Sequence, residues 1–205
     1  MRDAMHALKY SGLRPAAHGL GRMLADAIAQ LAPDAPAEML VVPVPLHRAK
    51  QAGRGFNQAR LLAAQALARL RRTHPAWRLT LVPGLLMRQR STQSQAGLTP
   101  RQRRINLRGA FSVALPEAVA GKHVLVIDDI LTTGATARAA AKALLNAGAA
   151  TVWVATLARA QRSIVYRPGN AAFYNDRDVI RAVPGNVLAI DLQAESRHEQ
   201  NQPSF

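Results

Sequence analysis

The stretch that decides the fold is Val124-Leu-Val-Ile-Asp128-Asp129-Ile-Leu-Thr132-Thr133-Gly134-Ala-Thr136. Its first four residues are entirely apolar, which predicts a strand covered on both faces. Two adjacent carboxylates follow, and then a turn of small and hydroxyl-bearing residues that opens a helix. In open α/β sheets, ligands bind beyond the carboxyl ends of the strands, where these carboxylates are expected to stand. The stretch therefore predicts an α/β fold and also the place of its binding site.

The carboxylates and the turn suit the two halves of a sugar phosphate. The backbone N–H groups of the turn, its threonine hydroxyls and the positive end of the next helix favour a phosphate monoester. Asp128 and Asp129 suit the two hydroxyls of a ribose, because each can accept one hydrogen bond. In a purely structural interpretation, the carboxylates end a strand and Thr132 or Thr133 caps a helix. A Walker loop and a dinucleotide fingerprint are excluded, because the Gly-Lys-Ser/Thr end and the three spaced glycines are missing.

Helices and strands alternate on both sides of this stretch. The expected helices cover residues 2–10, 18–31, 58–71 and 134–146, and the expected strands cover 39–42, 79–87 with an interruption at Pro83-Gly84, 110–115, 123–127 and 151–157. This order predicts one domain over residues 1–160, with a mainly parallel sheet flanked by helices and a helical N-terminal part at 1–37. Beyond residue 160 the pattern weakens, so 161–205 is interpreted as an extension that ends in a flexible tail at 195–205.

Composition excludes several classes of protein. The chain has 205 residues, of which 49% are apolar, and this argues against overall disorder. No run of about 18 apolar residues appears, so no membrane span is expected. The amphipathic start, residues 1–10, does not resemble a secretory signal. The absence of cysteine excludes disulfides, thiolate zinc sites and a cysteine nucleophile in this chain, and the six histidines lack ligand spacing. A cytoplasmic location is the expectation.

Positive charge is concentrated in one part of the chain. The sequence has 27 Lys and Arg against 12 Asp and Glu, a formal net charge of +15. Residues 39–116 hold 14 of the basic residues and no acidic residue, so the rest of the chain is close to neutral. Such a segment indicates an anionic partner, although a solvated basic surface would have the same composition.

Several of these strings resemble known families. Residues 124–136 resemble the phosphoribosyl pyrophosphate (PRPP) binding motif of type I phosphoribosyltransferases. Three further strings resemble the ComF family, also called ComFC or GntX-like, which is tied to natural competence. They are Val42-Pro-Val-Pro-Leu-His47, Arg54-Gly-Phe-Asn-Gln58, and Arg88-Gln-Arg-Ser-Thr-Gln-Ser-Gln-Ala-Gly-Leu98 through Arg104-Ile-Asn106 and Gly109-Ala-Phe111. The resemblance covers residues 1–160 and implies a type I phosphoribosyltransferase fold.

The resemblance also implies roles for individual residues. Asp128 and Asp129 would hold the ribose hydroxyls, directly or through Mg²⁺. The 5′-phosphate would be bound by Thr132, Thr133, Gly134, Ala135 and Thr136. The turn at 45–54 matches the place where such enzymes hold pyrophosphate, and its cationic candidates are Arg48, Lys50 and Arg54. Residues 88–108 match a mobile catalytic loop, whose closing arginines would be Arg88, Arg90, Arg101 and Arg104.

The implied reaction is the Mg²⁺-dependent displacement of pyrophosphate from PRPP, or a related phosphoribosyl compound, by an unidentified acceptor. Two other functions stay open: a non-catalytic competence factor that binds single-stranded DNA and meets other competence proteins, and a PRPP sensor without turnover. One departure from the family concerns zinc. Many ComF-like proteins begin with a four-cysteine zinc ribbon, whereas this chain has no cysteine, so no zinc is expected in it.

Overall fold

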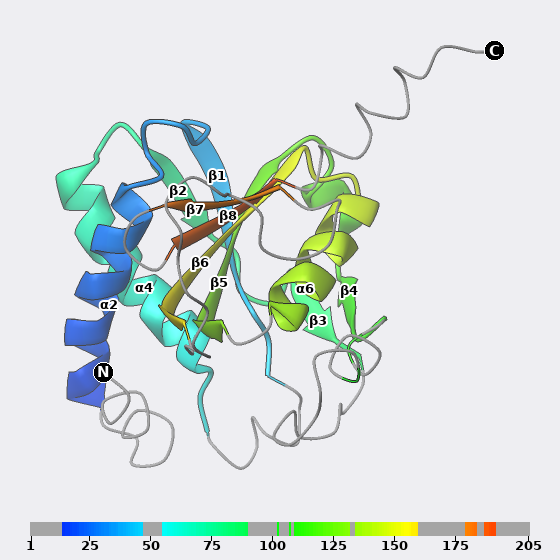
Figure 1. Ribbon diagram of the computed structural model, residues 1–205, viewed down its shortest axis with the longest axis horizontal. Coiled ribbons are helices and arrows are strands. Elements are labelled where there is room, and N and C mark those ends of the chain that lie inside the picture. Colours follow the sequence, from blue (N-terminus) through cyan, green and yellow to red (C-terminus); the bar gives the residue numbers. More distant parts are fainter. Residues whose placement is uncertain are drawn as a thin grey trace, which may run out of the picture.

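A six-stranded sheet, in the order β2-β1-β5-β6-β8-β7, lies at the centre of the computed structural model (Figure 1). The structure describes residues 14–46, 55–89, 102, 107, 109–131, 134–159, 179–183 and 187–191. The strands are β1 (Glu38–Pro43), β2 (Arg78–Leu81), β5 (His123–Leu131), β6 (Thr151–Arg159), β7 (Val179–Val183) and β8 (Val187–Asp191). The first four of these pair in parallel, and β8 and β7 join them antiparallel. The predicted α/β class with a mainly parallel sheet is therefore confirmed.

Two helices cover one face of the sheet, and a helix with a small ribbon covers the other (Figure 1). Helices α2 (Arg14–Ala29) and α4 (Gln58–Thr73) lie together on the first face. Helix α6 (Ala135–Asn146) lies on the second, with an antiparallel pair formed by β3 (Leu86–Arg88) and β4 (Phe111–Val113). We call this pair the β3–β4 ribbon. A short 3₁₀ helix, η1 (Pro116–Ala118), leads from β4 towards β5.

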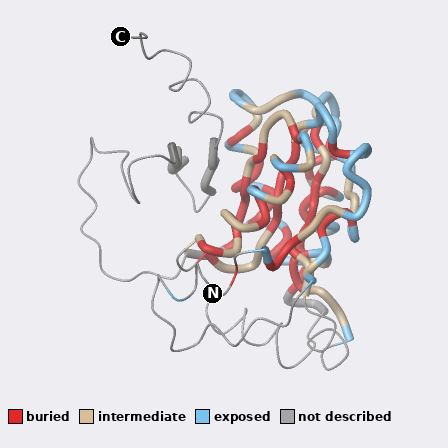
Figure 2. Tube along the Cα trace, turned by 90° about the vertical axis from the view of Figure 1, so that its right-hand side faces the viewer, coloured by how far each residue is buried: buried red, intermediate tan, exposed pale blue. Residues whose placement is uncertain are grey.

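The central strands are apolar because both of their faces are covered. Successive side chains of a strand point to opposite faces, and the two hydrophobic cores divide the residues of β5 accordingly. Leu125 and Ile127 pack with α2 and α4, whereas Val124 and Val126 pack with α6 and the ribbon. Figure 2 shows the buried residues concentrated along these strands in the middle of the molecule. Residues 124–127 of β5 therefore alternate between the two cores.

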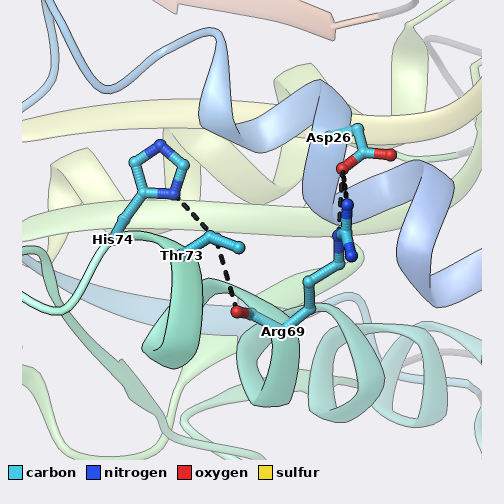
Figure 3. Close-up of polar contacts among 4 residues, drawn as sticks. All are labelled: Asp26, Arg69, Thr73 and His74. Atoms are coloured by element: carbon cyan, nitrogen blue, oxygen red, sulfur yellow. Dashed lines mark hydrogen bonds and ion pairs between the residues drawn. The ribbon is translucent and has the colours of Figure 1, made fainter.

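Helices α2 and α4 run in the same direction and approach closely. His18, in the first half of α2, meets Gln65 in the middle of α4, and further along both helices Asp26 meets Arg69. Figure 3 shows the second contact. The Asp26–Arg69 ion pair has an N–O distance of 3.0 Å, but it is largely exposed, and such pairs contribute at most about 1 kcal/mol. Thr73 and His74 complete the end of α4, where the Thr73 hydroxyl lies 3.3 Å from the Arg69 carbonyl oxygen and 2.9 Å from His74 Nδ1. Close packing, rather than charge, therefore holds this helix pair.

Several element boundaries differ from the sequence predictions. The helix predicted at 18–31 begins earlier, at Arg14, and ends at Ala29. The interrupted strand predicted at 79–87 is two strands in different sheets, because Pro83 cannot donate to a ladder and Gly84 adopts φ 91°. The strand predicted at 123–127 continues to Leu131.

The sequence analysis assigned no element to the extension beyond residue 160, yet β7 and β8 lie in it and continue the sheet from β6. The predicted helix at 2–10 and the tail at 195–205 lie outside the described residues. Within the described ranges, no helix is long and apolar enough to cross a membrane.

Gly21 tests the packing between α2 and α4. A Cβ atom added to Gly21 would overlap the Cβ of Gln65, whereas one added to Gly19, in the same helix, would meet nothing within 4 Å. We expect Gly21→Ala to lower the free energy of unfolding by about 1–3 kcal/mol through overpacking. Gly19→Ala should instead raise it by up to about 1 kcal/mol through helix propensity. Urea unfolding followed by circular dichroism measures both, and equal effects of the two substitutions would contradict the packing assignment.

Candidate functional site

Three helices begin at the carboxyl edge of the parallel strands. Helix α4 starts there, beside the end of β1, because its capping residue Asn57 donates from Nδ2 to the Val44 carbonyl at 3.0 Å. Helix α2 runs parallel to α4 and so begins at the same end, and α6 follows β5 after a short turn. The positive ends of three helix dipoles therefore face this edge, which favours an anionic ligand there.

The chain reverses its direction of travel across the sheet between β1 and β5. From β1 it moves outward to β2, whereas from β5 it moves the other way to β6. The backbone N–H of Val44, just past β1, donates to the Ile127 carbonyl at 2.8 Å. The segment that leaves β1 therefore runs alongside the strand that carries the two carboxylates. Ligands of open α/β sheets bind at such a switch point.

Asp128 and Asp129 lie within β5 rather than in the turn that follows it. Because side chains alternate along a strand, Asp128 continues the face of Val124 and Val126, towards α6 and the ribbon. Beyond Asp128 this simple alternation does not continue, because Ile130 packs against the core of α2 and α4 whereas Leu131 belongs to the core of α6 and the ribbon. The sequence interpretation placed the carboxylates at the start of a turn. The structure places both of them within the strand, with Asp128 on the side of the ribbon.

Local hydrogen bonds orient both carboxylates. Asp128 Oδ1 accepts a bond of 2.9 Å from the N–H of Asp129, and Asp129 Oδ1 accepts one of 2.8 Å from the N–H of Ile130. Both residues are partly exposed. Across the strand pair, Asp128 lies in register with Thr156 of β6, a residue that is only 1% exposed. Such local bonds restrict the directions in which the carboxylates can meet a ligand.

Arg88 lies at the end of β3, on the same side of the sheet as Asp128. Its guanidinium carbon is 5.6 Å from the centroid of the Phe111 ring. Burial lowers the pKa of Arg88 from its ordinary value, and the Asp128 carboxylate raises it in partial compensation. Sequence reasoning assigned Arg88 to a loop that closes over pyrophosphate. The structure adds an electrostatic interaction with Asp128, which the linear sequence did not reveal.

The turn into α6 has no side-chain cap among the described residues. Its N-cap is Gly134, with φ 71°, and no side chain bonds to this cap. Ala135 is buried and Thr136 partly buried in the first turn of the helix. The guanidinium of Arg138 folds back over this turn, so that a Cβ added to Gly134 would lie 3.2 Å from Arg138 Nη1. Sequence reasoning did not single out Arg138, although its position four residues after Gly134 places it above that glycine on a helix.

Eight of the predicted site residues lie outside the described part of the chain. They are Arg48, Lys50 and Arg54 of the pyrophosphate turn, Arg90, Arg101 and Arg104 of the loop, and Thr132 and Thr133 of the motif. The structure therefore brings Asp128, Asp129, Gly134, Ala135 and Thr136 to one edge of the sheet, with Arg88 beside Asp128.

A cavity of about 550 Å³ opens next to this edge, on the β2 side of β1. Its walls come from the end of β1, the start of α4 and the turn after β2, and they include Pro43, Phe56, Arg60 and Pro83. None of its described lining residues belongs to β5 or α6. The cavity therefore adjoins the region of the predicted pyrophosphate turn and is separate from the carboxylates of the motif.

Comparison with known proteins identifies the class of this molecule. The family model described as "Phosphoribosyl transferase domain" matches residues 58–180, more than half of the chain. Helix α4, the ribbon, β5 and α6 all lie within the matched range. The chain therefore belongs to the phosphoribosyl transferase domain family.

Similarity to individual curated proteins defines the family of this chain more narrowly. The DNA utilization protein YhgH of Escherichia coli K12 is 36% identical over 157 residues, which are 76% of this chain and 65% of that protein. Competence protein ComFC of Bacillus subtilis is 31% identical over 160 residues, 78% of this chain and 60% of that protein. Competence protein F of Haemophilus influenzae is 35% identical over 121 residues, 58% of this chain and 50% of that protein. Together with the domain match, these relatives show a ComF-family protein.

The chain spans less than two thirds of the length of these curated relatives. Among solved structures, a hypoxanthine phosphoribosyltransferase of Staphylococcus aureus is 15% identical, with a TM-score of 0.42 and coverage of 68% of this chain and 62% of that chain. A glutamine PRPP amidotransferase of B. subtilis, complexed with ADP and GMP, is 24% identical, with a TM-score of 0.39 and coverage of 69% and 26%. These similarities concern the fold alone.

Gly134 tests the geometry of the turn. Its φ of 71° is in the left-handed region, as is the φ of 70° at Gly121. A Cβ atom added to Gly121 would meet nothing within 4 Å. We expect alanine at either position to lower the free energy of unfolding by about 1–2 kcal/mol through backbone strain. Gly134→Ala should lower it further, because Arg138 must move. Urea unfolding of both variants checks this, and a smaller loss for Gly134→Ala than for Gly121→Ala would contradict the arrangement.

Proposed function

We propose that this protein binds PRPP between the carboxyl ends of β1 and β5 and catalyses the displacement of its pyrophosphate by an acceptor. One observation carries the proposal. The carboxylates Asp128 and Asp129, the Gly134 turn and the start of α6 meet at one edge of the sheet, where the direction of the chain switches. Membership of the phosphoribosyl transferase domain family supports the same substrate class.

Each end of PRPP has a counterpart in this arrangement. The start of α6, from Gly134 to Thr136, would bind the 5′-phosphate through backbone N–H groups and the helix dipole, and Arg138 adds positive charge nearby. Thr132 and Thr133 of the motif would add hydroxyl donors. Asp128 and Asp129 would accept hydrogen bonds from the ribose hydroxyls. Pyrophosphate would then lie towards the end of β1, next to the turn that carries Arg48, Lys50 and Arg54.

The donor set fits Mg²⁺. Within the described ranges, no group of three or more His, Cys, Asp or Glu side chains could hold a metal ion. Mg²⁺ in nucleotide and phosphate sites is commonly bound by only one or two carboxylates together with substrate phosphates. Asp128 and Asp129 supply such carboxylates. When bound, Mg²⁺ would neutralise negative charge on the departing pyrophosphate.

The contribution of the protein to the reaction would be positioning and charge stabilisation. The acceptor forms a bond to the anomeric carbon while the bond to pyrophosphate breaks, and the pyrophosphate leaves with the electron pair of that bond. Positive charge that develops on the ribose would lie near Asp128 and Asp129, and negative charge on the leaving group near the basic residues after β1. Arg90, Arg101 and Arg104 would close over the leaving group and exclude water.

Calorimetry with Mg²⁺–PRPP tests the proposal directly. We expect wild-type protein to bind, and Asp128→Asn or Asp129→Asn to weaken binding by about tenfold or more, because a hydrogen bond to a charged group contributes about 1.5–3 kcal/mol. Glu117→Gln removes one exposed carboxylate outside the site and serves as the matched control. Absence of binding, or binding that neither aspartate variant weakens, would refute the proposal.

Turnover separates an enzyme from a PRPP sensor. Pyrophosphate release, measured while nucleobases, amines and nucleic acids are screened as acceptors, should rise with one acceptor class and fail in the Asp128→Asn/Asp129→Asn double variant. Tight binding without release by any acceptor would instead identify a sensor.

Two observations favour a second candidate, a role in handling single-stranded DNA. Relatives of this chain are called DNA utilization protein and competence protein, and residues 39–116 contain 14 basic residues and no acid. Exposed arginines occur at both ends of α4, with Arg60 near the carboxyl edge and Arg71 and Arg72 in the last turn. If DNA binds at the carboxyl edge, replacement of Arg60 should weaken DNA binding more than replacement of Arg71 and Arg72.

A salt series with single-stranded DNA tests this candidate. For each phosphate contact, the slope of log affinity against log salt should change by about 0.7. We expect Arg60→Gln to weaken binding and to reduce the slope by about that amount, whereas the Arg71→Gln/Arg72→Gln control should leave both unchanged. Weak binding with little dependence on salt, or sensitivity only at Arg71 and Arg72, would exclude a DNA site at the carboxyl edge.

A further inference from the structure

Arg88 is the last residue of β3, at the end of the β3–β4 ribbon that faces Asp128. It pairs in register with Phe111 of β4, and its guanidinium lies over the Phe111 ring, 5.6 Å from the centroid. Phe111 itself is part of the buried core between the ribbon, α6 and the sheet. Arg88 is thus a cation held against an aromatic ring at the border of an apolar core.

A cation in such a place needs an opposite charge nearby. Burial of a charged group is unfavourable unless the charge is paired or hydrogen-bonded. The segment that contains Arg88 offers none, because residues 39–116 include no Asp or Glu. Glu117, the next acid along the chain, is exposed on η1. The nearby carboxylate is that of Asp128, which reaches this side of the sheet from β5.

The position of Asp128 supports this pairing. The ladder between β5 and β6 is continuous through the pair Asp128–Thr156, so Asp128 follows Val124 and Val126 on the face of the ribbon. The Asp128 carboxylate raises the pKa of Arg88 against the opposing effect of burial. The Arg88 cation would in turn stabilise the ionised carboxylate.

We propose that Arg88 is a positioning residue, which fixes the direction of the Asp128 carboxylate from the β3–β4 ribbon before a ligand binds. Phe111 would act with it by holding the guanidinium in place. The part of this proposal that concerns the ligand rests on the proposed PRPP site.

A double-mutant cycle in ligand-free protein tests the coupling without any substrate. We expect Arg88→Gln to lower the urea midpoint of unfolding in the wild-type background and to have a clearly smaller effect in the Asp128→Asn background. Additive shifts of the midpoint would overturn the proposal, because independent residues give additive changes. Should Arg88→Gln fail to fold, the same cycle with Arg88→Met, which also removes the charge but keeps an apolar side chain against Phe111, decides the question.

Titration with Mg²⁺–PRPP tests the consequence for the site. Arg88→Gln should weaken binding by about 10- to 100-fold, a range typical for residues that orient ligand-binding groups. Arg88→Lys should recover part of the loss, and Phe111→Leu should cause a smaller loss. In the Asp128→Asn background, Arg88→Gln should cause little further loss. Full, multiplicative losses in the double variant would overturn the proposal.

Ser112→Ala is the matched control for a merely structural role of the ribbon. Ser112 follows Phe111 in β4, and its Oγ accepts a hydrogen bond from Gln89 Nε2. Its removal should leave PRPP affinity unchanged, whereas equal losses for Ser112→Ala and Arg88→Gln would overturn a specific role for Arg88. If wild-type protein does not bind PRPP, the proposed function fails, and the ligand-free cycle still decides whether Arg88 and Asp128 are coupled.

Discussion

The parallel pairing of β1 with β5 is the constraint on which the rest of the site depends. It aligns Pro43 with Ile127 and continues through the bond from Val44 N–H to the Ile127 carbonyl. One chain segment leaves the sheet there towards α4, and the other carries the two aspartates towards α6. Without this register, the end of β1 and the carboxylates of β5 would not meet at one edge. The apolar residues of both strands fix it, because each must match a covered face.

The basic residues and the two aspartates come from different parts of the chain. The acid-free segment, residues 39–116, supplies β1 except for Glu38, together with α4, β2 and the ribbon, whereas the aspartates lie on β5, the strand next to β1. Three helix N-termini add positive potential to the same edge. A ligand with phosphates at both ends and a sugar between them suits this distribution better than a uniformly basic surface would. The net charge of +15 is therefore informative mainly through its position along the chain.

Sequence reasoning predicted the parallel core and the position of the motif, because long apolar runs and glycine-bounded helices are local signals. It could not predict the division of 79–87 between two sheets or the strands beyond residue 160, since both depend on partners distant in sequence. Asp128 and Asp129 were identified, but their place within β5 was missed because the strand was expected to end before them. Thr156 and Arg138 were not singled out, and Phe111 was noted only within a string that resembles the family, because such residues become part of a site only when register or helix geometry brings them there.

The alternation of residues 124–128 between two cores makes the strand far more sensitive to changes in length than to changes in composition. A conservative replacement in β5 alters one contact, whereas the loss or gain of a single residue before Asp128 would exchange the faces of every side chain that follows. The carboxylate beside Arg88 would then point towards α2 and α4, and apolar side chains would change cores with it. Variation among related chains should therefore include substitutions in this strand, while insertions and deletions collect in the loops at its ends.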